Sequence, residues 1–231
     1  MTISDPGIAA PSKATVDEIQ EQILERICFA HYPPGAQLKE AVLAKEFGVS
    51  RTPVRDAIAR IGHLGLVETR NGVGTVVIEL SAERVRHLYE MRMELAQMIG
   101  TLSPITITEY HRDEARSIYE NAVALRERLD SQEYVKLNQR LQTLITSLIG
   151  NHSLREFWNQ AYFQSSSVWH RMEQIVGVVA YDALVQEASD LANALEREDI
   201  AAVGFVQRIY IGYGFQLIEE HLLKPKNERI F

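Results

Sequence analysis

The hydrophobic residues between Thr15 and Gly65 recur at the spacing of α-helices, and three short helices are predicted there. Thr15 and Glu18 have the spacing of a capping box, which marks the start of the first helix. The segment HYPPGAQ ends this helix near Ala30, because proline lacks the N–H that a helix needs. The apolar positions of the first helix are Val16, Ile19, Ile23, Leu24 and Ile27.

A very short turn separates the second predicted helix from the third. The segment LKEAVLAKEFG ends at Gly48, a good residue just after a helix, and places on one side Leu38, Val42, Leu43 and Phe47. Ser50 is the expected N-cap of the third helix, and Pro53 lies in its first turn, where a missing N–H has no cost. The third helix ends at Gly65, and its expected buried stripe is Val54, Ile58, Ile61 and Leu64.

After the third helix the pattern changes to two short runs of β-prone residues, LVETR and GTVVIE. Asn71 and Gly72 stand between them, and this pair favours a hairpin because both residues tolerate a positive φ. Three helices followed by a hairpin predict a winged helix-turn-helix domain over residues 15–79. We expect residues 1–14 to form a disordered tail.

From Ser81 onward the pattern is helical throughout, and no strand-like alternation is seen. Capping boxes are predicted at Thr106–Glu109 and at Ser153–Glu156. The expected helices lie near 82–100, 107–130, 132–149, 153–176, 182–197 and 199–222. The fold class is therefore mainly α: an N-terminal winged helix-turn-helix with a small hairpin, and an antiparallel all-α bundle over residues 80–231.

Composition indicates the class of protein but does not indicate what the protein binds. The chain has 231 residues, 46% of them hydrophobic, which suits a globular protein of one large domain or two small ones. A single cysteine, no evident signal peptide and no apolar run long enough to span a membrane lead us to expect a cytoplasmic protein. The net charge of −7 does not by itself indicate nucleic-acid binding.

The segment GVSRTPVRDAI carries the strongest chemical signal. Arg51 and Arg55 lie at the start of a helix, where the helix dipole disfavours cations unless a partner supplies anions. In a helix-turn-helix the second helix enters the major groove with its N-terminal residues on the DNA. We therefore predict contacts to phosphates or guanine edges from Arg51 and Arg55, phosphate contacts from Ser50 and Thr52, and backbone or minor-groove contacts from a wing tip formed by Asn71 and Gly72. A merely solvated basic face is the alternative, and surface charge is the favoured interpretation of Arg60 and Arg70.

The segment LKEAVLAKEFGVSRTPVRDAIARIGHLGLVETRNGVGTVV resembles the DNA-binding domain of GntR-family transcriptional regulators. The helical remainder resembles the FCD domain of the FadR subfamily through LYEMRMEL, LNQRLQTLITSLIGNHSL and ANALEREDIAA. The resemblance assigns the DNA contacts to the same six residues: Ser50, Arg51, Thr52, Arg55, Asn71 and Gly72. Ala41 stands where many members have an arginine, so one family contact is missing.

Many FCD domains hold a divalent metal through an aspartate, a histidine four residues later, and two more histidines. The resemblance places these positions at Asn138 and Gln142, near Ala188 and near Tyr210. Neutral amides are poor ligands for transition metals, and the histidines of the chain have no mutual spacing that would replace the set. We therefore expect no metal and no other cofactor.

A polar cavity for a small organic ligand is the remaining interpretation of the bundle. Arg92 matches an arginine that often faces the cavity in this subfamily, and a buried arginine suits a carboxylate or phosphate. Arg171 is a second candidate cation, Asn138 and Gln142 give a polar lining, and Tyr210 gives a wall with a polar tip. Simple core packing is the favoured interpretation of Tyr162 and Trp169, and a surface position remains open for Asn138.

These patterns predict a ligand-responsive DNA-binding regulator of transcription, specifically a repressor. It would act as a homodimer on a pseudo-palindromic double-stranded operator and bind a small acidic metabolite. Two other classes stay open: a helical-bundle enzyme, and an adaptor that uses the winged helix for protein contacts. The enzyme lacks support, because the sequence has no nucleophile motif, metal cluster or phosphate-binding glycine loop.

Overall fold

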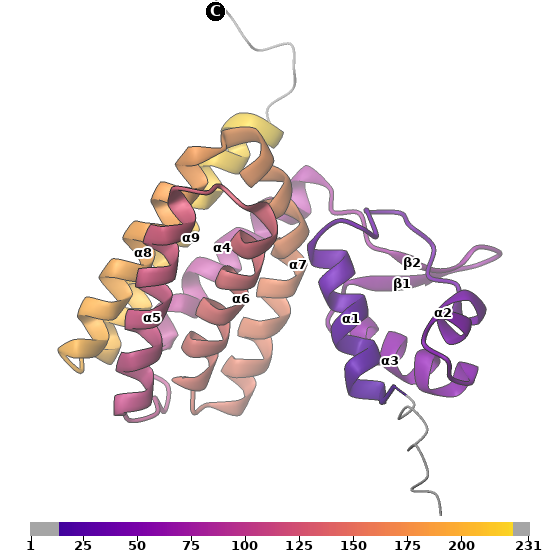
Figure 1. The fold of residues 1–231 in the computed structure, drawn as a ribbon, viewed down its shortest axis with the longest axis horizontal. Helices are drawn as coiled ribbons and strands as arrows, with labels where there is room; N and C mark the ends of the chain where they lie inside the picture. The colour runs from indigo at the N-terminus through magenta and orange to yellow at the C-terminus, as the bar shows by residue number, and fades with distance from the viewer. Residues whose placement is uncertain (1–13, 224–231) are drawn as a thin grey trace, which may run out of the picture.

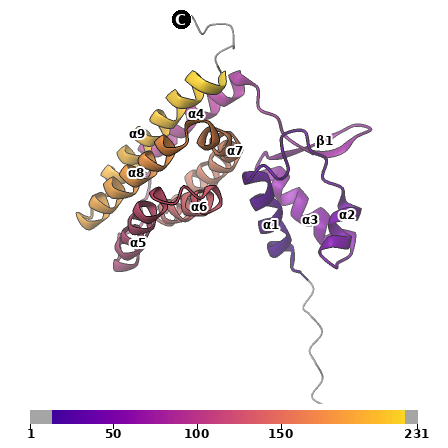
Figure 2. The ribbon, with the colours of Figure 1, turned by 45° about the horizontal axis from the view of Figure 1, so that its top comes forward.

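The computed structural model describes residues 14–223, which form a small N-terminal domain beside a helical bundle (Figure 1). Both views show α1 (Val16–Cys28) on the side of its domain that faces the bundle, whereas α2 (Glu40–Glu46) and the hairpin lie farther away (Figure 2). The predicted tail over residues 1–14 lies outside the described residues except for Ala14.

The N-terminal domain is the predicted winged helix-turn-helix. The capping box of Thr15 and Glu18 is confirmed at the start of α1, and α3 (Arg51–His63) follows α2 after a four-residue turn. Gly48, with φ +65°, and Gly65, with φ +70°, follow these two helices as expected. The fully buried centre of this domain is formed by Ile19, Ile23, Ile27, Val54, Ala57 and Ile61.

The hairpin pairs β1 (Val67–Arg70) antiparallel to β2 (Gly74–Val77), with Val67 opposite Val77. Gly72 at its tip has a φ of +76°, the left-handed conformation that the Asn-Gly pair predicts. The segment before α2 pairs with the other edge of β2, because Leu38 N–H donates to the carbonyl of Thr75. This added strand-like segment holds the hairpin against the helices.

The bundle contains the six predicted helices: α4 (Ala82–Met98), α5 (Glu109–Arg126), α6 (Ser131–Ser147), α7 (His152–Val176), α8 (Val178–Glu196) and α9 (Ile200–Ile218), which a short π-helix extends over Glu219–Leu223. Neighbours run antiparallel. On α5 and α8, for example, Arg116 in the middle of α5 pairs with Glu196 at the end of α8, and Arg126 at the end of α5 pairs with Asp182 near the start of α8. Its core is built mainly of leucine, isoleucine and aromatic side chains, including fully buried Tyr134 and Trp158.

Helices α4 and α9 pack especially closely at one end. A Cβ added to Gly204 would come within 2.6 Å of the carbonyl oxygen of Ala96, and one added to Gly100 within 2.6 Å of the Cα of Ala201. Only glycine permits this backbone approach, so these two positions set the distance between the helices.

Several local predictions were wrong. Helix α5 is capped by Thr108 with His111 as its partner, rather than by Thr106 with Glu109. Asn151, rather than Ser153, caps α7, because the side chain nearest the first free N–H groups makes the cap. Helix α8 begins at Val178, four residues before its predicted start, since Gly177 alone turns the chain. Val42 is 59% exposed, so it does not join the buried side of α2.

The two domains meet where α1 packs against α7. Phe163 of α7 contacts both hydrophobic cores. The side-chain amide of Gln164 donates to the carbonyl of Leu64, just beyond α3. The bundle therefore contacts the N-terminal domain on the face opposite its wing and through the end of α3.

Candidate functional site

The first turn of α3 presents the predicted DNA-contacting side chains to solvent. Ser50, Arg51, Thr52 and Arg55 are all exposed. The Ser50 side chain makes no capping hydrogen bond, and the first turn of the helix contains no acidic residue. The free N–H groups and the positive end of the dipole therefore act together with the two arginines to attract anions.

Arg55 has an intramolecular partner that the sequence interpretation missed. Its Nε and Nη2 atoms donate to the two carboxylate oxygens of Glu40 on α2, at 3.1 and 3.0 Å. This forked ion pair holds the pKa of Glu40 below its usual range. Arg51, by contrast, has no ion pair within residues 14–223 and extends into solvent. Without DNA, the anion beside Arg55 is thus supplied by the protein.

Arg60 and Arg70 are already paired within the domain. Arg60 donates to Asp17 of α1 at 2.6 Å, and Arg70 donates to Glu68 on its own strand at 2.8 Å. Their placement supports the interpretation of both as surface charges, and Arg60 therefore serves as a matched control for Arg51 and Arg55.

The hairpin tip is exposed to solvent at the far edge of the domain. Asn71, Gly72 and Val73 are exposed, and the side-chain amide of Gln37 bonds the carbonyl of Val73. A tip held in this way is suited to reach a nucleic-acid backbone or a minor groove beside the recognition helix.

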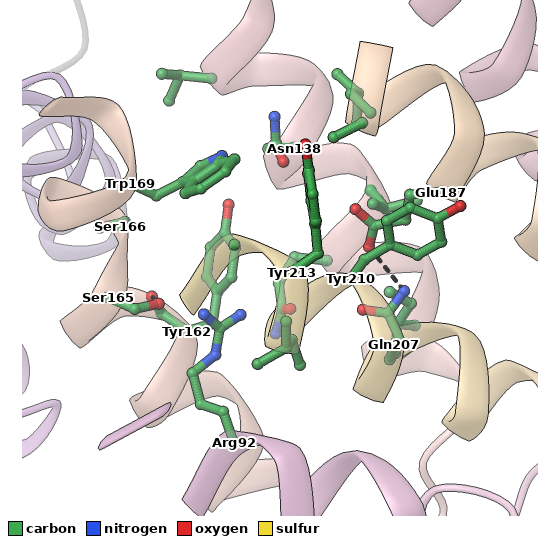
Figure 3. Close-up of a pocket in the computed structure, with 18 of the residues that line it drawn as sticks. Arg92, Asn138, Tyr162, Ser165, Ser166, Trp169, Glu187, Gln207, Tyr210 and Tyr213 are labelled. Carbon is green, nitrogen blue, oxygen red and sulfur yellow. Dashed lines mark hydrogen bonds between the residues drawn. The ribbon is translucent and has the colours of Figure 1, made fainter. Parts of the chain in front are cut away.

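The bundle contains a cavity lined by residues of α4, α6, α7, α8 and α9 (Figure 3). The volume of this cavity is about 90 Å³, and one water needs about 10–15 Å³. The cavity therefore suits a metabolite of roughly six to nine non-hydrogen atoms rather than a long acyl chain.

Four of the five predicted cavity residues line this space: Arg92, Asn138, Gln142 and Tyr210. Arg171 does not, and its prediction was wrong. It is exposed on the opposite side of α7 and lines a separate pocket between the domains, beside Leu66 and Glu79. Core packing was favoured for Tyr162 and Trp169. Both line the cavity, and Trp169 also packs against the bundle core.

The most unusual polar group in the cavity is Glu187, which the sequence interpretation did not select. Its Oε1 accepts from the side-chain amide of Gln207 at 2.9 Å. Burial raises the pKa of Glu187 to about 7, although the bond from Gln207 and the charge of Arg92 oppose this shift. Helical spacing around Glu187 resembles that of a surface glutamate, so no local signal could have identified it.

The positions that correspond to the metal ligands of other FCD domains do not fit a transition metal. The amide of Asn138 donates to the carbonyl of Tyr134, and that of Gln142 donates to Thr146 and Asn159. Ala188 has no donor atom. The Tyr210 hydroxyl donates outward to Asp190 at 2.7 Å. No group of three or more histidine, cysteine or acidic side chains suited to a metal is found among the described residues.

One segment of α7 separates the cavity from the N-terminal domain. Ser166 lines the cavity, and its Oγ lies 3.1 Å from Sγ of Cys28 at the end of α1. His170 also lines the cavity, and its ring meets the edge of the Phe29 ring with centroids 6.1 Å apart. A change in the position of these α7 side chains therefore changes their contacts with the end of α1.

The N-terminal domain, with the cationic start of α3 free beside a wing, defines the class of winged helix-turn-helix DNA-binding proteins. The family follows from the sequence. Residues 15–77 match the gntR family of bacterial regulatory proteins, and residues 87–205 match the FCD domain. The chain belongs to the GntR family, and this pairing of domains makes it a DNA-binding transcriptional regulator.

Two relatives illustrate the range of the family. The chain is 28% identical over 184 residues to a probable D-xylose utilization operon transcriptional repressor of Paenarthrobacter nicotinovorans, covering 79% of each chain. It is 28% identical over 145 residues to the uncharacterized HTH-type transcriptional regulator YdhC of Bacillus subtilis, covering 60% of this chain and 62% of that protein.

A solved structure supports the fold. McbR/YncC of Escherichia coli superimposes with a TM-score of 0.76 at 17% identity, covering 90% of this chain and 98% of that one. Within residues 14–223, no helix is both long and apolar enough to cross a membrane.

Proposed function

We propose that the chain is a repressor that binds a pseudo-palindromic operator as a homodimer and responds to a small acidic metabolite in its bundle cavity. The observation that carries this proposal is the shared α7 segment, because Ser166 and His170 line the cavity and contact the end of α1. A ligand that shifts these side chains changes how the DNA-binding domain is held. It releases DNA if it binds the DNA-free arrangement more tightly.

The DNA contacts are proposed for the six exposed residues Ser50, Arg51, Thr52, Arg55, Asn71 and Gly72. One recognition helix reads only a few base pairs, so a second copy related by two-fold symmetry is needed for a specific operator. Arg55 then exchanges the carboxylate of Glu40 for a phosphate or a guanine edge, or keeps both.

The outer face of the α4–α9 pair is proposed as the surface between the two copies. These helices are antiparallel, since Arg86 near the start of α4 pairs with Glu219 just after α9. Four large apolar residues are exposed along the pair at 40–63%: Met91, Met98, Phe205 and Ile209. The ion pair of Arg208 with Glu94 lies among them and offers both charge signs, as a self-complementary two-fold contact requires.

Sedimentation tests this surface. The purified chain is expected near twice 26.2 kDa without DNA, and Ile209→Glu is expected to yield monomers because it buries a charge at the contact. Tyr110→Glu, at a 64% exposed position on α5, is the control and leaves the dimer intact. A parent chain that is monomeric at micromolar concentration would contradict the proposal.

The coupling through α7 is tested by Phe29→Ala in the full chain. A thermal-shift screen of carboxylates and phosphorylated metabolites first identifies a ligand, and its effect on operator affinity is then measured. The variant should retain DNA binding but lose most of the ligand effect, because the contact with His170 is removed. Phe157→Ala, at a 57% exposed position on α7, should respond like the parent. Equal responses of the parent and Phe29→Ala would exclude this route.

The donor set leads us to expect no stoichiometric transition metal in the bundle. Asn138, Gln142, Ala188 and Tyr210 supply two neutral amides, a methyl group and a hydroxyl that is bonded elsewhere. Elemental analysis after dialysis against a chelator measures this directly. Zinc, nickel or manganese near one atom per chain would contradict the expectation.

A regulator, rather than an enzyme, is the function that the contacts support, and the adaptor alternative has a simple test. A DNA-binding role requires that affinity for random duplex DNA fall steeply as salt rises, because phosphate contacts release counterions. An adaptor that uses its winged helix for protein contacts would show no such shift.

A further inference from the structure

The cavity contains more hydrogen-bond acceptors than the protein satisfies. Glu187 receives one bond, from Gln207 to Oε1, and within residues 14–223 no side chain donates to its Oε2. Gln207 uses its Nε2 atom in that bond, which leaves its oxygen as an acceptor. The Asn138 amide is in a similar state, since its Nδ2 donates to the carbonyl of Tyr134. These three side chains come from α6, α8 and α9 (Figure 3).

The same cavity contains one cation that is not neutralised. Figure 3 shows the Arg92 side chain directed from α4 into the cavity. Its guanidinium lies 5.2 Å from the centroid of the Tyr89 ring, which orients it. In the described part of the chain, Arg92 makes no ion pair within 4.0 Å, so Glu187 and Arg92 share the cavity without touching.

A ligand that connects two such groups must carry complementary chemistry at its two ends. Arg92 favours a carboxylate at one end of the ligand, because a guanidinium group binds a carboxylate with two parallel hydrogen bonds. Glu187, Gln207 and Asn138 call for donors, because a second carboxylate there would face a carboxylate and two amide oxygens. A plain carboxylic acid would leave these acceptors buried and unpaired, which costs binding free energy.

We propose that Glu187 makes the cavity selective for small organic acids that carry hydrogen-bond donors, either hydroxyl or ammonium groups, in addition to the carboxylate held by Arg92. This inference rests on the proposed function, since it names the chemistry of the ligand in the same cavity. The acid has about six to nine non-hydrogen atoms, from the volume of the cavity.

Four probes of similar length separate the contributions of the carboxylate, the hydroxyl groups and the ammonium group to binding affinity. Butanoate has only the carboxylate, 2,3,4-trihydroxybutanoate adds hydroxyls, 4-aminobutanoate adds an ammonium, and butane-1,2,3,4-tetrol has hydroxyls without the carboxylate. Binding to the full chain is measured by calorimetry at about pH 8, above the pKa of about 7 of Glu187, so that this carboxyl is ionised and accepts hydrogen bonds. At least one of the two substituted acids is expected to bind roughly tenfold or more tightly than butanoate and than the tetrol, because hydrogen bonds to a charged group are the stronger ones. Comparing these two acids tells hydroxyl from ammonium.

Glu187→Gln and Glu196→Gln form a matched pair of variants on α8. Glu187→Gln should bring the affinity of the preferred acid to within about threefold of that of butanoate, with both affinities measured on the variant. Glu196→Gln removes an exposed carboxylate that pairs with Arg116, and it should keep the full preference. Arg92→Ala should remove the binding of all three acids, and thermal unfolding of each variant shows that it is folded.

Salt-dependent DNA binding is measured on the same samples. It distinguishes a failure of the ligand inference from a failure of the proposed function. If duplex DNA is bound and butanoate binds as tightly as the substituted acids, or Glu187→Gln keeps their preference, this inference is wrong and the proposed regulator stands. The absence of binding for all four probes also overturns it. If duplex DNA is not bound at all, the proposed function itself fails.

Discussion

The two domains each bring together an arginine and a glutamate from different helices, and they do so in opposite ways. On the proposed DNA-binding surface, Arg55 and Glu40 form a two-pronged pair in contact with solvent. In the bundle, Arg92 and Glu187 share a cavity but stay apart. An exposed pair contributes little to stability and exchanges readily for phosphate. A separated pair in a cavity leaves two polar groups that a ligand can satisfy at once.

The largest expected effect concerns the exposed pair and its neighbour. Arg51→Ala and Arg55→Ala should each weaken specific DNA binding by about 1–3 kcal/mol if they contact bases. Stability should stay the same, because both side chains are exposed. Fluorescence anisotropy with an operator duplex measures the loss, and Arg60→Ala provides the control on the same helix, since Arg60 pairs with Asp17. Unchanged affinity in both variants would refute the docking of α3.

The pH dependence of the free energy of unfolding tests the burial of the Glu187 carboxyl in the bundle cavity. In the folded chain the pKa of the Glu187 carboxyl is about 7, against its ordinary value of 4.5. Between these values the folded state holds more protons than the unfolded state, so this group lowers stability as pH rises from about 4.5 to 7 and adds no slope above that. Relative to Glu187→Gln, the parent should lose on the order of 2 kcal/mol across this window.

Urea unfolding of parent and variant at several pH values measures that difference, with Glu196→Gln as a control that follows the parent. A constant difference from pH 4.5 to 7 would show that the Glu187 carboxyl is well solvated. The cavity would then be wetter than the contacts of Glu187 with Gln207 imply.

The smallest expected effect is that of Glu40→Gln. Removing the carboxylate frees Arg55 and takes a negative charge away from the DNA-binding surface. Affinity for any duplex should rise a few-fold, and the slope of log K against log salt should steepen by up to about 0.9, which corresponds to one more phosphate contact. Weaker operator binding by the variant would instead show that Glu40 holds Arg55 in its reading position.

The residues of the proposed DNA-binding surface could be selected from the sequence because they lie on two short segments. Ser50 to Arg55 lie at the start of one helix, and Asn71 with Gly72 form one hairpin tip, so local pattern alone predicts where they lie. The partner of Arg55 was not predictable, since Glu40 lies fifteen residues away and reaches it only through the packing of α2 on α3.

The cavity was only partly predictable, because five helices contribute to it. Resemblance to the family selected four of its residues, Arg92, Asn138, Gln142 and Tyr210. Arg171 was assigned to the cavity wrongly, because the rotation of α7 turns its side chain away. Glu187 stands next to Ala188, at which a family ligand position was expected, but only the rotation of α8 shows that the neighbouring carboxylate faces the cavity. Spacing along one helix does not determine such rotations.

The most direct test of the central claim is a genome-wide map of the sites that the chain occupies in the organism that encodes it. If the proposed function is correct, the map contains a small number of discrete sites that share a pseudo-palindromic sequence. These sites are lost in a variant carrying both Arg51→Ala and Arg55→Ala. Genes beside the sites should then handle an organic acid with further hydrogen-bond donors. Uniform background occupancy, or sites that persist in the double variant, would contradict the account.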